Sequence, residues 1–334
     1  MTGAGHTLRN PIRIGTRRSN LALVQAESVK QSLLQLWPDL QFEIEALRTL
    51  GDKDQSKELY NFGAKALWTT ELEEKLTSGQ LDIVVHCLKD MPTNLPDSCE
   101  LATIPLYDDR RDALIVKAGL PYTSLDTLPH DAVVGTSSVR RSAQLKRLYP
   151  HLKFANLRGN VETRLAKVDE PTSDFTCMIM SACGLERIGL QDRINQRMSS
   201  EEGGIYHAVG QGALGMEIRK GDMPIKNIVD KLADTRSTLA CLAERELRRA
   251  LEGGCSVPIG VETRWLDEKH ENLLLRGIVV SLDGSQAVEE SGQRELKSSD
   301  DAERLGRDLA AQLTRGGADS ILREINAHRP AKAD

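Results

Sequence analysis

Aromatic side chains are scarce in this 334-residue chain, where Phe, Trp and Tyr together make up 4%. The formal net charge at pH 7 is −5. With few rings to stack on bases and no overall positive field, the chain lacks the composition of a nucleic-acid-binding protein, and any anion-binding site must be local. No stretch approaches the length of a membrane span. A hydrophobic content of 40% and a charged content of 28% are typical of a soluble globular protein.

Patterns that would indicate disulfides or zinc are also missing. The six cysteines form no Cys-x-x-Cys pair, and the seven histidines show no paired spacing. Scattered cysteines favour reduced thiols in a reducing compartment, and no metal site is expected. Residues 1–11 show neither the apolar core of a signal peptide nor an Arg- and Ser-rich amphipathic run. We therefore expect a cytoplasmic protein with no nucleic-acid or membrane partner.

A chain of this length is expected to contain two or three domains. In the first two-thirds, short apolar runs alternate with helical patterns, as in α/β folds. Strands are predicted at 12–15, 42–47, 82–86, 101–104, 113–116, 132–135, 153–156 and 176–180, with helices after Ser19 and from Thr70, the latter with a capping box to Glu73. The last hundred residues predict a long helix at 235–251, strands near 260–265, 273–282 and 287–296, and helices near 300–315 and 319–327. That part reads as a small α+β domain with an antiparallel sheet.

Cys255 follows two glycines and precedes Pro258 by three residues. Glycine serves sharp turns and proline cannot continue a helix, so this thiol is expected on a tight, accessible loop, where it is a candidate for covalent chemistry. No histidine is near it in sequence. A base brought close by the fold would make it a nucleophile, so a cysteine hydrolase stays open. Small core residues are the expected role of four other cysteines, Cys87, Cys177, Cys183 and Cys241. His207 precedes the glycine-rich segment 208–213, where we expect a hinge or a close backbone approach and not a histidine ligand.

Arginines occupy three strand-to-helix junctions, where the helix dipole disfavours cations by roughly 0.3–1 kcal/mol each. The junctions are Thr16 to Ser19, with Arg17; Gly135 to Arg141, with Ser138 as N-cap and Arg140 and Arg141 in the first turn; and Leu157 to Asn160, with Asn160 as N-cap, Arg158 just before it and Arg164 one turn on. The first turn of the helix after Thr70 carries acidic residues instead, so basic residues in the first turn are not a general feature of the helices in this chain. An anion bound at these N-termini, a carboxylate or a phosphate, would explain them. The alternative is that these arginines pair with buried acids or lie on solvated faces. For any one arginine this is as probable as anion binding, but for all three junctions together it is less so.

Lys89 and Asp90 come directly after the predicted strand 82–86. A carboxylate there can act as a general acid or base, or stabilise a developing cation. The alternative is a Lys–Asp pair that serves the turn before Pro92. Lys65 is a loop cation with the same ambiguity, and Arg187 is a weaker further member of the arginine set.

Together these segments resemble those of the porphobilinogen deaminase, or hydroxymethylbilane synthase, family. The matching segments are Thr16-Arg17-x-Ser19, His86-x-x-Lys89-Asp90, Val134-Gly135-Thr136-Ser137-Ser138-x-Arg140-Arg141, Leu157-Arg158-Gly159-Asn160-Val161-x-Thr163-Arg164, Ala208-Val209-Gly210-Gln211-Gly212-Ala213 and Glu252-Gly253-Gly254-Cys255-x-Val257-Pro258-Ile259-Gly260. The resemblance runs from about residue 12 to about residue 327.

The resemblance implies two periplasmic-binding-protein-like α/β domains around a cleft and a small C-terminal α+β domain that carries the cysteine loop. The divisions would be 1–106 with 213–230, 114–206, and 235–334. It implies a monomeric transferase of haem biosynthesis. That enzyme joins four porphobilinogen molecules head-to-tail on a covalent dipyrromethane cofactor, releases ammonia and yields the linear tetrapyrrole hydroxymethylbilane.

The resemblance also assigns roles to residues. Cys255 would carry the dipyrromethane through a thioether. Asp90 would contact pyrrole nitrogens, stabilise the azafulvene-like cation left by ammonia loss, and act as acid and base. The other cofactor-binding residues would be Lys89, Ser19, Thr136, Ser137, Ser138, Arg140, Arg141, Arg158, Gly159 and Arg164, and the substrate-binding residues Arg17, Arg187, Gln211 and Lys65.

One departure concerns the loop before residue 70. The family commonly has Gly-Gly-Lys-x-Leu-Phe where this chain has Gly63-Ala64-Lys65-Ala66-Leu67-Trp68, so a stiffer and bulkier loop is expected. The competing hypothesis from another class is a two-domain module that binds a carboxylate or phosphate without catalysis. It makes Cys255 structural and predicts no covalent adduct.

Overall fold

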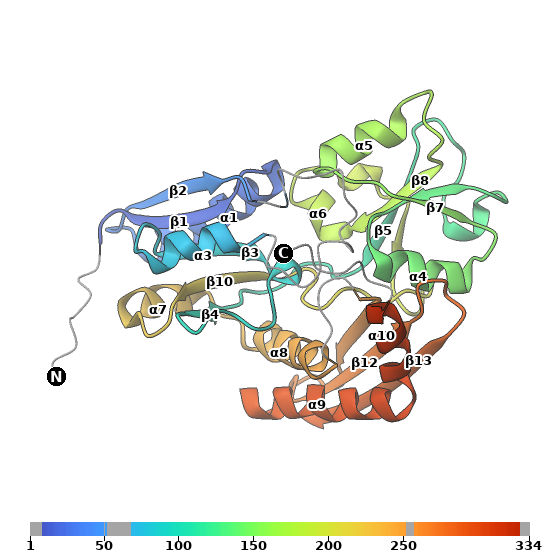
Figure 1. Cartoon of the computed structure of the whole chain (residues 1–334). Helices are drawn as coiled ribbons and strands as arrows, with labels where there is room; N and C mark the ends of the chain where they lie inside the picture. Colours follow the sequence, from blue (N-terminus) through green and yellow to red (C-terminus); the bar gives the residue numbers. More distant parts are fainter. Residues whose placement is uncertain (1–8, 50, 52–67, 252–256, 328–334) are drawn as a thin grey trace. The chain divides into compact units, whose positions relative to one another are not determined.

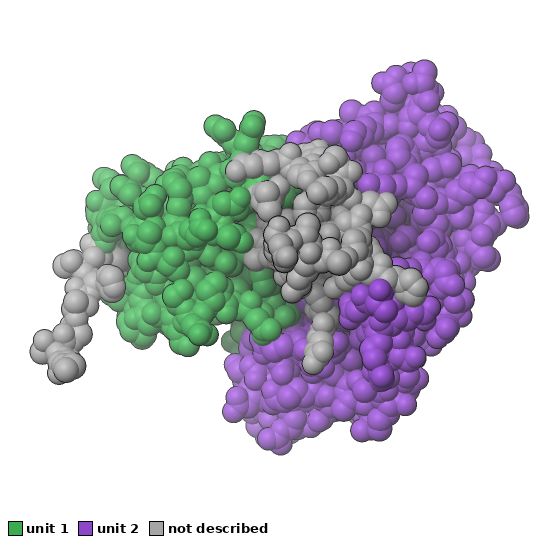
Figure 2. All heavy atoms as spheres, viewed as in Figure 1, with its two compact units in different colours: residues 1–54, 66–107, 213–238 green, residues 55–65, 108–212, 239–334 purple. Residues whose placement is uncertain are grey.

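The computed structural model describes residues 9–49, 51, 68–251 and 257–327 (Figure 1). Two residues of the expected site, Lys65 and Cys255, lie outside this range. The chain divides into two compact units (Figure 2). Of the described residues, unit 1 holds those up to 51, 68–107 and 213–238, and unit 2 holds 108–212 and those from 239 onward.

Unit 1 is built on a five-stranded sheet with the order β2-β1-β3-β10-β4. Strand β1 is parallel to β2 and β3, whereas β10 runs antiparallel to β3 and β4. The elements are β1 (Ile12–Arg17), α1 (Asn20–Leu36), β2 (Phe42–Leu47), α3 (Thr70–Thr77), β3 (Ile83–Cys87), the 3-10 turn η2 (Leu88–Asp90), β4 (Cys99–Thr103), β10 (Leu214–Arg219), α7 (Met223–Val229) and the 3-10 turn η5 (Asp230–Leu232).

The two faces of this sheet are covered by different helices. Val29 and Leu33 of α1 pack against Ile14 and Val85 on one face. The alternate side chain Val84 packs with α3 on the other face. Because β1 and β3 are parallel neighbours, their carboxyl ends meet at the same edge, which brings Arg17 and the η2 turn together.

Unit 2 contains a second five-stranded sheet, with the order β7-β6-β8-β5-β9. Here too the first three strands are parallel and the fourth, β5, is antiparallel to its neighbours. The elements are β5 (Asp112–Val116), the 3-10 turn η3 (Leu125–Thr127), β6 (Val133–Gly135), α4 (Val139–Leu148), β7 (Lys153–Ala155), α5 (Val161–Asp169), β8 (Cys177–Ser181), α6 (Ala182–Glu186), the 3-10 turn η4 (Gln191–Arg193) and β9 (Gln196–Met198). The two sheets thus share one topology.

The C-terminal part adds a three-stranded antiparallel sheet, β11-β12-β13. Its elements are α8 (Thr235–Ala250), β11 (Ile259–Trp265), β12 (Asn272–Val280), β13 (Ala287–Glu295), α9 (Ser299–Arg315) and α10 (Ala318–Ala327). Helix α9 lies along the sheet (Figure 1). It also approaches α8 so closely at Gly306 that a Cβ there would collide with the carbonyl oxygen of Ala243. The expected fold class, two α/β parts followed by a small α+β part with an antiparallel sheet, is confirmed.

Some local predictions were wrong. The N-cap of α3 is Thr69, not Thr70, and its side chain makes no capping bond, so the expected box with Glu73 does not form. Ser138 is the N-cap of α4 as expected, but its hydroxyl caps nothing. Strand β10 was missed. No helix within the described residues is both long and apolar enough to cross a membrane.

Candidate functional site

In unit 1, Arg17 and Asp90 meet at the carboxyl edge of the sheet. The Nη1 atom of Arg17 lies 3.8 Å from Oδ2 of Asp90, and the two side chains are 22% and 33% exposed. The guanidinium carbon of Arg17 lies 3.9 Å from the centre of the Trp68 ring, within cation–π range. Asp90 is therefore a partly exposed carboxylate beside a guanidinium that is itself held by an aromatic ring.

Two buried residues hold the turn that carries Lys89 and Asp90. Leu88 and Met91 are fully buried, and the Leu88 N–H donates to the carbonyl of Ala213 at 3.0 Å. The Lys89 and Asp90 side chains between these anchors remain partly exposed. A carboxylate held in this way can accept a proton or balance a positive charge on a bound molecule.

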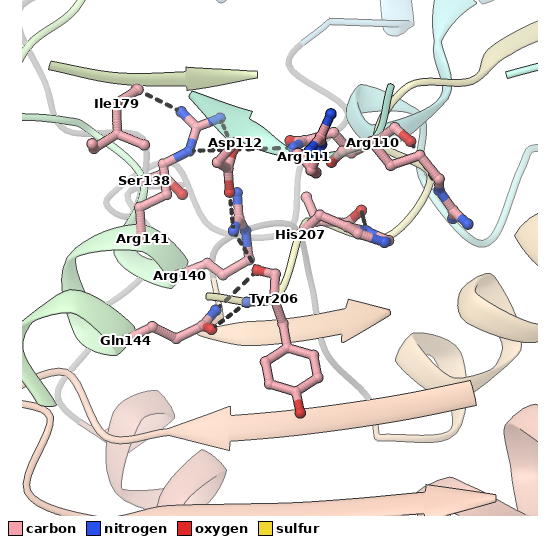
Figure 3. A network of polar contacts seen from close by, with 12 residues as sticks. Arg110, Arg111, Asp112, Ser138, Arg140, Arg141, Gln144, Ile179, Tyr206 and His207 are labelled. Carbon is pink, nitrogen blue, oxygen red and sulfur yellow. Dashed lines mark hydrogen bonds and ion pairs between the residues drawn. The ribbon is translucent and has the colours of Figure 1, made fainter. Parts of the chain in front are cut away.

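In unit 2, Arg140 and Arg141 converge on the fully buried carboxylate of Asp112 (Figure 3). Arg140 Nη1 donates to Oδ2 at 2.7 Å, and Arg141 donates to Oδ1 from Nη2 at 2.7 Å and from Nε at 2.9 Å. Arg140 also donates to the carbonyl of Tyr206 at 2.6 Å, and Arg141 to that of Ile179 at 3.0 Å. For these two arginines, the pairing with a buried acid that the sequence left open does occur.

The charges of this triad do not cancel. Burial opposes ionisation of Asp112, but the two guanidinium groups outweigh it and hold the pKa of Asp112 well below its ordinary range. Burial lowers the pKa of Arg140, against the opposing charge of Asp112. Two cations share one carboxylate, so the triad as a whole is positive. An anion next to it would be stabilised, because a buried charge is poorly screened.

Gln211 joins this triad from the glycine-rich segment. Its Nε2 donates to the carbonyl of Arg110 at 2.8 Å and to Oδ1 of Asp112 at 3.0 Å. Its Oε1 is buried and has no hydrogen-bond partner within the described part of the chain. Arg110 in turn pairs with the buried Glu244 of α8. The structure therefore brings Arg140, Arg141 and Gln211 together through a residue that none of the sequence motifs contained.

The third arginine junction, between β7 and α5, is built differently. Asn160 caps α5, because its Oδ1 accepts the N–H of Thr163 at 2.8 Å. Gly159 has φ of 125°, which a side chain would strain. Arg158 is buried, and Arg164 Nε reaches the Asn160 carbonyl at 3.4 Å. As expected, this junction has a polar cap and flanking cations.

The remaining expected residues lie at three further places. Ser19 caps α1 by accepting the N–H of Ala22 at 3.4 Å. The Thr136 hydroxyl accepts the N–H of Ser138 at 3.1 Å, and Ser137 beside it is partly buried. Arg187 pairs with Asp108 at 2.8 Å and donates to the carbonyl of Gly212 at 2.7 Å, so it binds both segments at which the chain enters and leaves this part of unit 2.

His207 and most of the cysteines that were expected to be core residues are buried. Burial, then the charge of Arg110, lowers the pKa of His207 to about 4, which keeps the ring neutral. Burial raises the pKa of both Cys177 and Cys241 to about 12. Cys183 is buried as well. Cys87 departs from the expectation: it is partly exposed, and its Sγ lies 3.1 Å from Nε2 of Gln25. Within the described residues, no group of acidic, histidine and cysteine side chains could hold a metal ion.

Sequence reasoning missed Asp112, Arg110 and Glu244, and it treated Trp68 only as a bulky substitution. One signal was available for Asp112. It opens the strand Asp112–Val116, all of whose residues are buried, and a carboxylate in such a strand requires a cationic partner.

The fold and these junctions define an α/β protein with two five-stranded mixed sheets and a C-terminal antiparallel sheet, in which the buried Asp112–Arg140–Arg141 triad carries an excess of positive charge. Residues 12–227 match the family model described as the porphobilinogen deaminase dipyrromethane cofactor-binding domain, and residues 238–315 match that of the porphobilinogen deaminase C-terminal domain. The chain belongs to the porphobilinogen deaminase family.

Curated relatives cover almost the whole chain. It is 49% identical to the porphobilinogen deaminase of Saccharomyces cerevisiae over 95% of this chain and 98% of that protein. It is 51% identical to that of Yarrowia lipolytica over 94% of this chain and 93% of that protein. Among solved structures, the periplasmic VFT2 domain of Bordetella pertussis BvgS aligns with 66% of this chain and 86% of that one, at 13% identity and a TM-score of 0.39, too weak a likeness to support an argument.

Proposed function

We propose that this protein is a hydroxymethylbilane synthase, a transferase of tetrapyrrole biosynthesis. It joins four porphobilinogen molecules head-to-tail on a covalent dipyrromethane, releases ammonia and yields linear hydroxymethylbilane. The observation that carries the proposal is the positive triad of Asp112, Arg140 and Arg141 within a chain of this family. Every porphobilinogen brings an acetate and a propionate, so the growing chain is a polyanion that such a triad would stabilise.

The residues present fit the dipyrromethane, because two buried guanidinium groups sharing one carboxylate retain a positive charge for its acidic side chains. The residues that would hold it are Ser19, Lys89, Thr136, Ser137, Ser138, Arg140, Arg141, Arg158, Gly159 and Arg164, with Cys255 as the thioether anchor. When bound, it supplies a pyrrole ring with a free α-carbon to which the next unit is joined.

Asp90 is the proposed catalytic residue. As ammonia leaves the aminomethyl group of the substrate, positive charge develops on the substrate, and the partly exposed Asp90 carboxylate balances it. The same carboxylate then accepts the proton released when the new carbon–carbon bond forms. Arg17 orients Asp90 and, with Arg187, Gln211 and Lys65, would bind the substrate carboxylates.

Three broader features belong to the same proposal. The chain would divide into three domains, at 1–106 with 213–230, at 114–206 and at 235–334. The enzyme would act as a monomer. It would work in the cytoplasm, where its thiols stay reduced.

The mass of the denatured, purified chain tests the covalent cofactor. We expect an increment that matches a two-ring pyrrole, a colour reaction with Ehrlich's reagent, and loss of both in Cys255→Ser. An unmodified mass on protein that turns over porphobilinogen would contradict the proposal. A module that only binds anions would show neither the increment nor turnover.

A second measurement tests Asp90. Asp90→Asn keeps the shape of the side chain but removes its charge and basicity, so we expect turnover to fall by about 10²–10⁴-fold while the covalent mass increment stays. Asp97→Asn, at an exposed position after the same turn, is the matched control and should be close to wild type. Near-normal turnover of Asp90→Asn would refute the role.

A further inference from the structure

Three ionisable side chains lie buried together in unit 1: Glu73 on α3, His86 on β3 and Glu217 on β10. The Nε2 atom of His86 lies 2.9 Å from Oε2 of Glu217. The other carboxylate oxygen of Glu217, Oε1, is buried and has no hydrogen-bond partner among the residues that the structure describes. None of the three has a role in the reaction proposed above.

Stability does not explain this cluster. Beside the cluster, α3 and the sheet bury the apolar side chains of Leu72, Leu76 and Val84 completely. Buried ion pairs are often no more stabilising than apolar side chains of similar volume, because desolvation of the charges offsets their attraction. A histidine and two carboxylates at this place therefore need another explanation.

The strand register places the His86–Glu217 contact at the end of β3. Glu217 lies opposite Val84, and Gly215 lies opposite His86. Residues opposite each other in an antiparallel pair share a face, and Val84 faces α3, so Glu217 and His86 do as well. The contact therefore ties β3 to β10 one residue before β3 ends at Cys87.

The turn that carries Asp90 rests on the same part of β10. A Cβ at Gly215 would lie 3.0 Å from Cδ1 of Leu88, so the Leu88 side chain packs directly against this glycine. The Leu88 N–H bonds the carbonyl of Ala213, just before β10. A shift of β3 along β10 would therefore move Leu88, and with it Asp90 two residues later.

Of the two carboxylates in the cluster, Glu217 is the one that contacts His86. Burial, together with the charge of Glu217, raises the pKa of Glu73, so Glu73 takes up a proton more readily than an ordinary carboxyl. On β4, burial and then the charge of Glu217 raise the pKa of Cys99 to about 11, so this thiol stays neutral. His86 is then the partner that faces the Glu217 carboxylate.

We propose that Glu217 is a positioning residue for Asp90: through its bond to His86 it fixes the end of β3 and hence the Leu88–Asp90 turn. This inference rests on the proposed function. It assigns Glu217 no contact with substrate or cofactor; Glu217 acts only through His86 and the backbone that follows it.

The test compares Glu217→Gln and Glu73→Gln as proteins that carry their covalent cofactor, with kcat and KM for porphobilinogen as readouts. Because small displacements of a catalytic group cost roughly 10²-fold, we expect kcat of Glu217→Gln to fall at least about tenfold, with KM within about twofold and the covalent mass normal. Glu73→Gln, on α3, leaves the His86–Glu217 contact between β3 and β10 in place, so its kcat should stay within about twofold of wild type. Equal losses in both variants, or none in Glu217→Gln, would overturn the proposal.

A double variant separates an effect on the position of Asp90 from an effect on stability. In His86→Leu/Glu217→Met an apolar pair of similar volume replaces the charged one, so the melting temperature should be at or above that of the wild type. We still expect kcat to be at least about tenfold lower, because the bond that holds the end of β3 is gone. A stable double variant with wild-type kcat would exclude positioning by Glu217. A wild-type protein without turnover would instead contradict the proposed function.

Discussion

Arg17 shows how an aromatic neighbour can position a charged side chain. Its guanidinium lies on the ring of Trp68 and beside Asp90. Stacking on a ring limits the orientations of a guanidinium and leaves its N–H groups available in the plane. The ring in turn depends on a glycine, since a Cβ at Gly51 would collide with it. Trp68 is therefore more than a bulkier substitute for phenylalanine in this chain.

The first prediction concerns Trp68. A partly exposed cation–π contact contributes about 1 kcal/mol, so Trp68→Leu should raise KM for porphobilinogen by about fivefold through a less ordered Arg17. Trp68→Phe keeps a ring and should raise KM by about twofold or less. Steady-state kinetics give both values. Trp265→Leu, on β11, is the control, and the idea fails if its KM changes as much as that of Trp68→Leu.

His207 yields a prediction about pH. Its pKa is about 4 in the folded protein, against an ordinary value of 6.5. As the pH falls from about 6.5 towards 4, His207 becomes protonated in the unfolded chain but stays neutral in the folded protein. The free energy of unfolding therefore decreases as the pH falls through this window. We expect His207 alone to lower the free energy of unfolding by about 2 kcal/mol between pH 7 and pH 5.

Urea unfolding at the two pH values measures this loss. His207→Gln cannot take up the proton and should show a smaller decrease by that amount. His130→Gln, at an exposed position, should behave like the wild type. Equal pH dependence of His207→Gln and wild type would mean that His207 is not held neutral.

Among the elements, two helices with arginines in or beside the first turn differ in their caps. Asn160 accepts the Thr163 N–H at the start of α5, whereas the Ser138 side chain makes no capping bond to α4. We expect Asn160→Ala to lower the free energy of unfolding by about 1 kcal/mol, and Ser138→Ala to change it by less than about 0.5 kcal/mol. Denaturant titration of both variants checks the contrast, and equal costs would contradict it. Asn160→Ser, which retains a capping oxygen, should recover most of the loss.

Features that depend on neighbouring residues in the chain could be predicted from the sequence, whereas features that depend on distant residues could not. Strand β2 was predicted at its observed bounds, and Asn160 was predicted as a cap, because both depend on neighbours in the chain. Strand β10 was missed because Gly215 and the buried Glu217 interrupt its apolar pattern. The arginine junctions were found from helix electrostatics, but their partner Asp112 was not, since only the strand order of the sheet brings it to α4.

On the scale of the whole molecule, two of the places at which the chain passes between its two units are Tyr107–Asp108 and Gly212–Ala213; a further one, Thr238–Leu239, lies within α8. Within unit 2 the two passages lie side by side, because the Asp108 N–H bonds the carbonyl of Gly212 at 3.1 Å. Fully buried Glu244 on α8 binds both passages, as it pairs with Arg110 and accepts the N–H of Gly210 at 2.9 Å. One carboxylate thus joins two distant chain segments to the C-terminal part.

The last prediction concerns this carboxylate. Glu244→Gln leaves the Arg110 guanidinium buried without its counter-charge, so we expect the free energy of unfolding to fall by about 3–5 kcal/mol. Urea unfolding of the purified chain measures it, with Glu201→Gln as control, because the Arg264–Glu201 pair is exposed and should be worth less than about 1 kcal/mol. Arg110→Met/Glu244→Gln should be more stable than Glu244→Gln alone, since the unpaired charge is then gone. If the double variant is no more stable, the cost comes from the lost Gly210 bond and not from Arg110, and Glu244 acts on one passage of the chain instead of both.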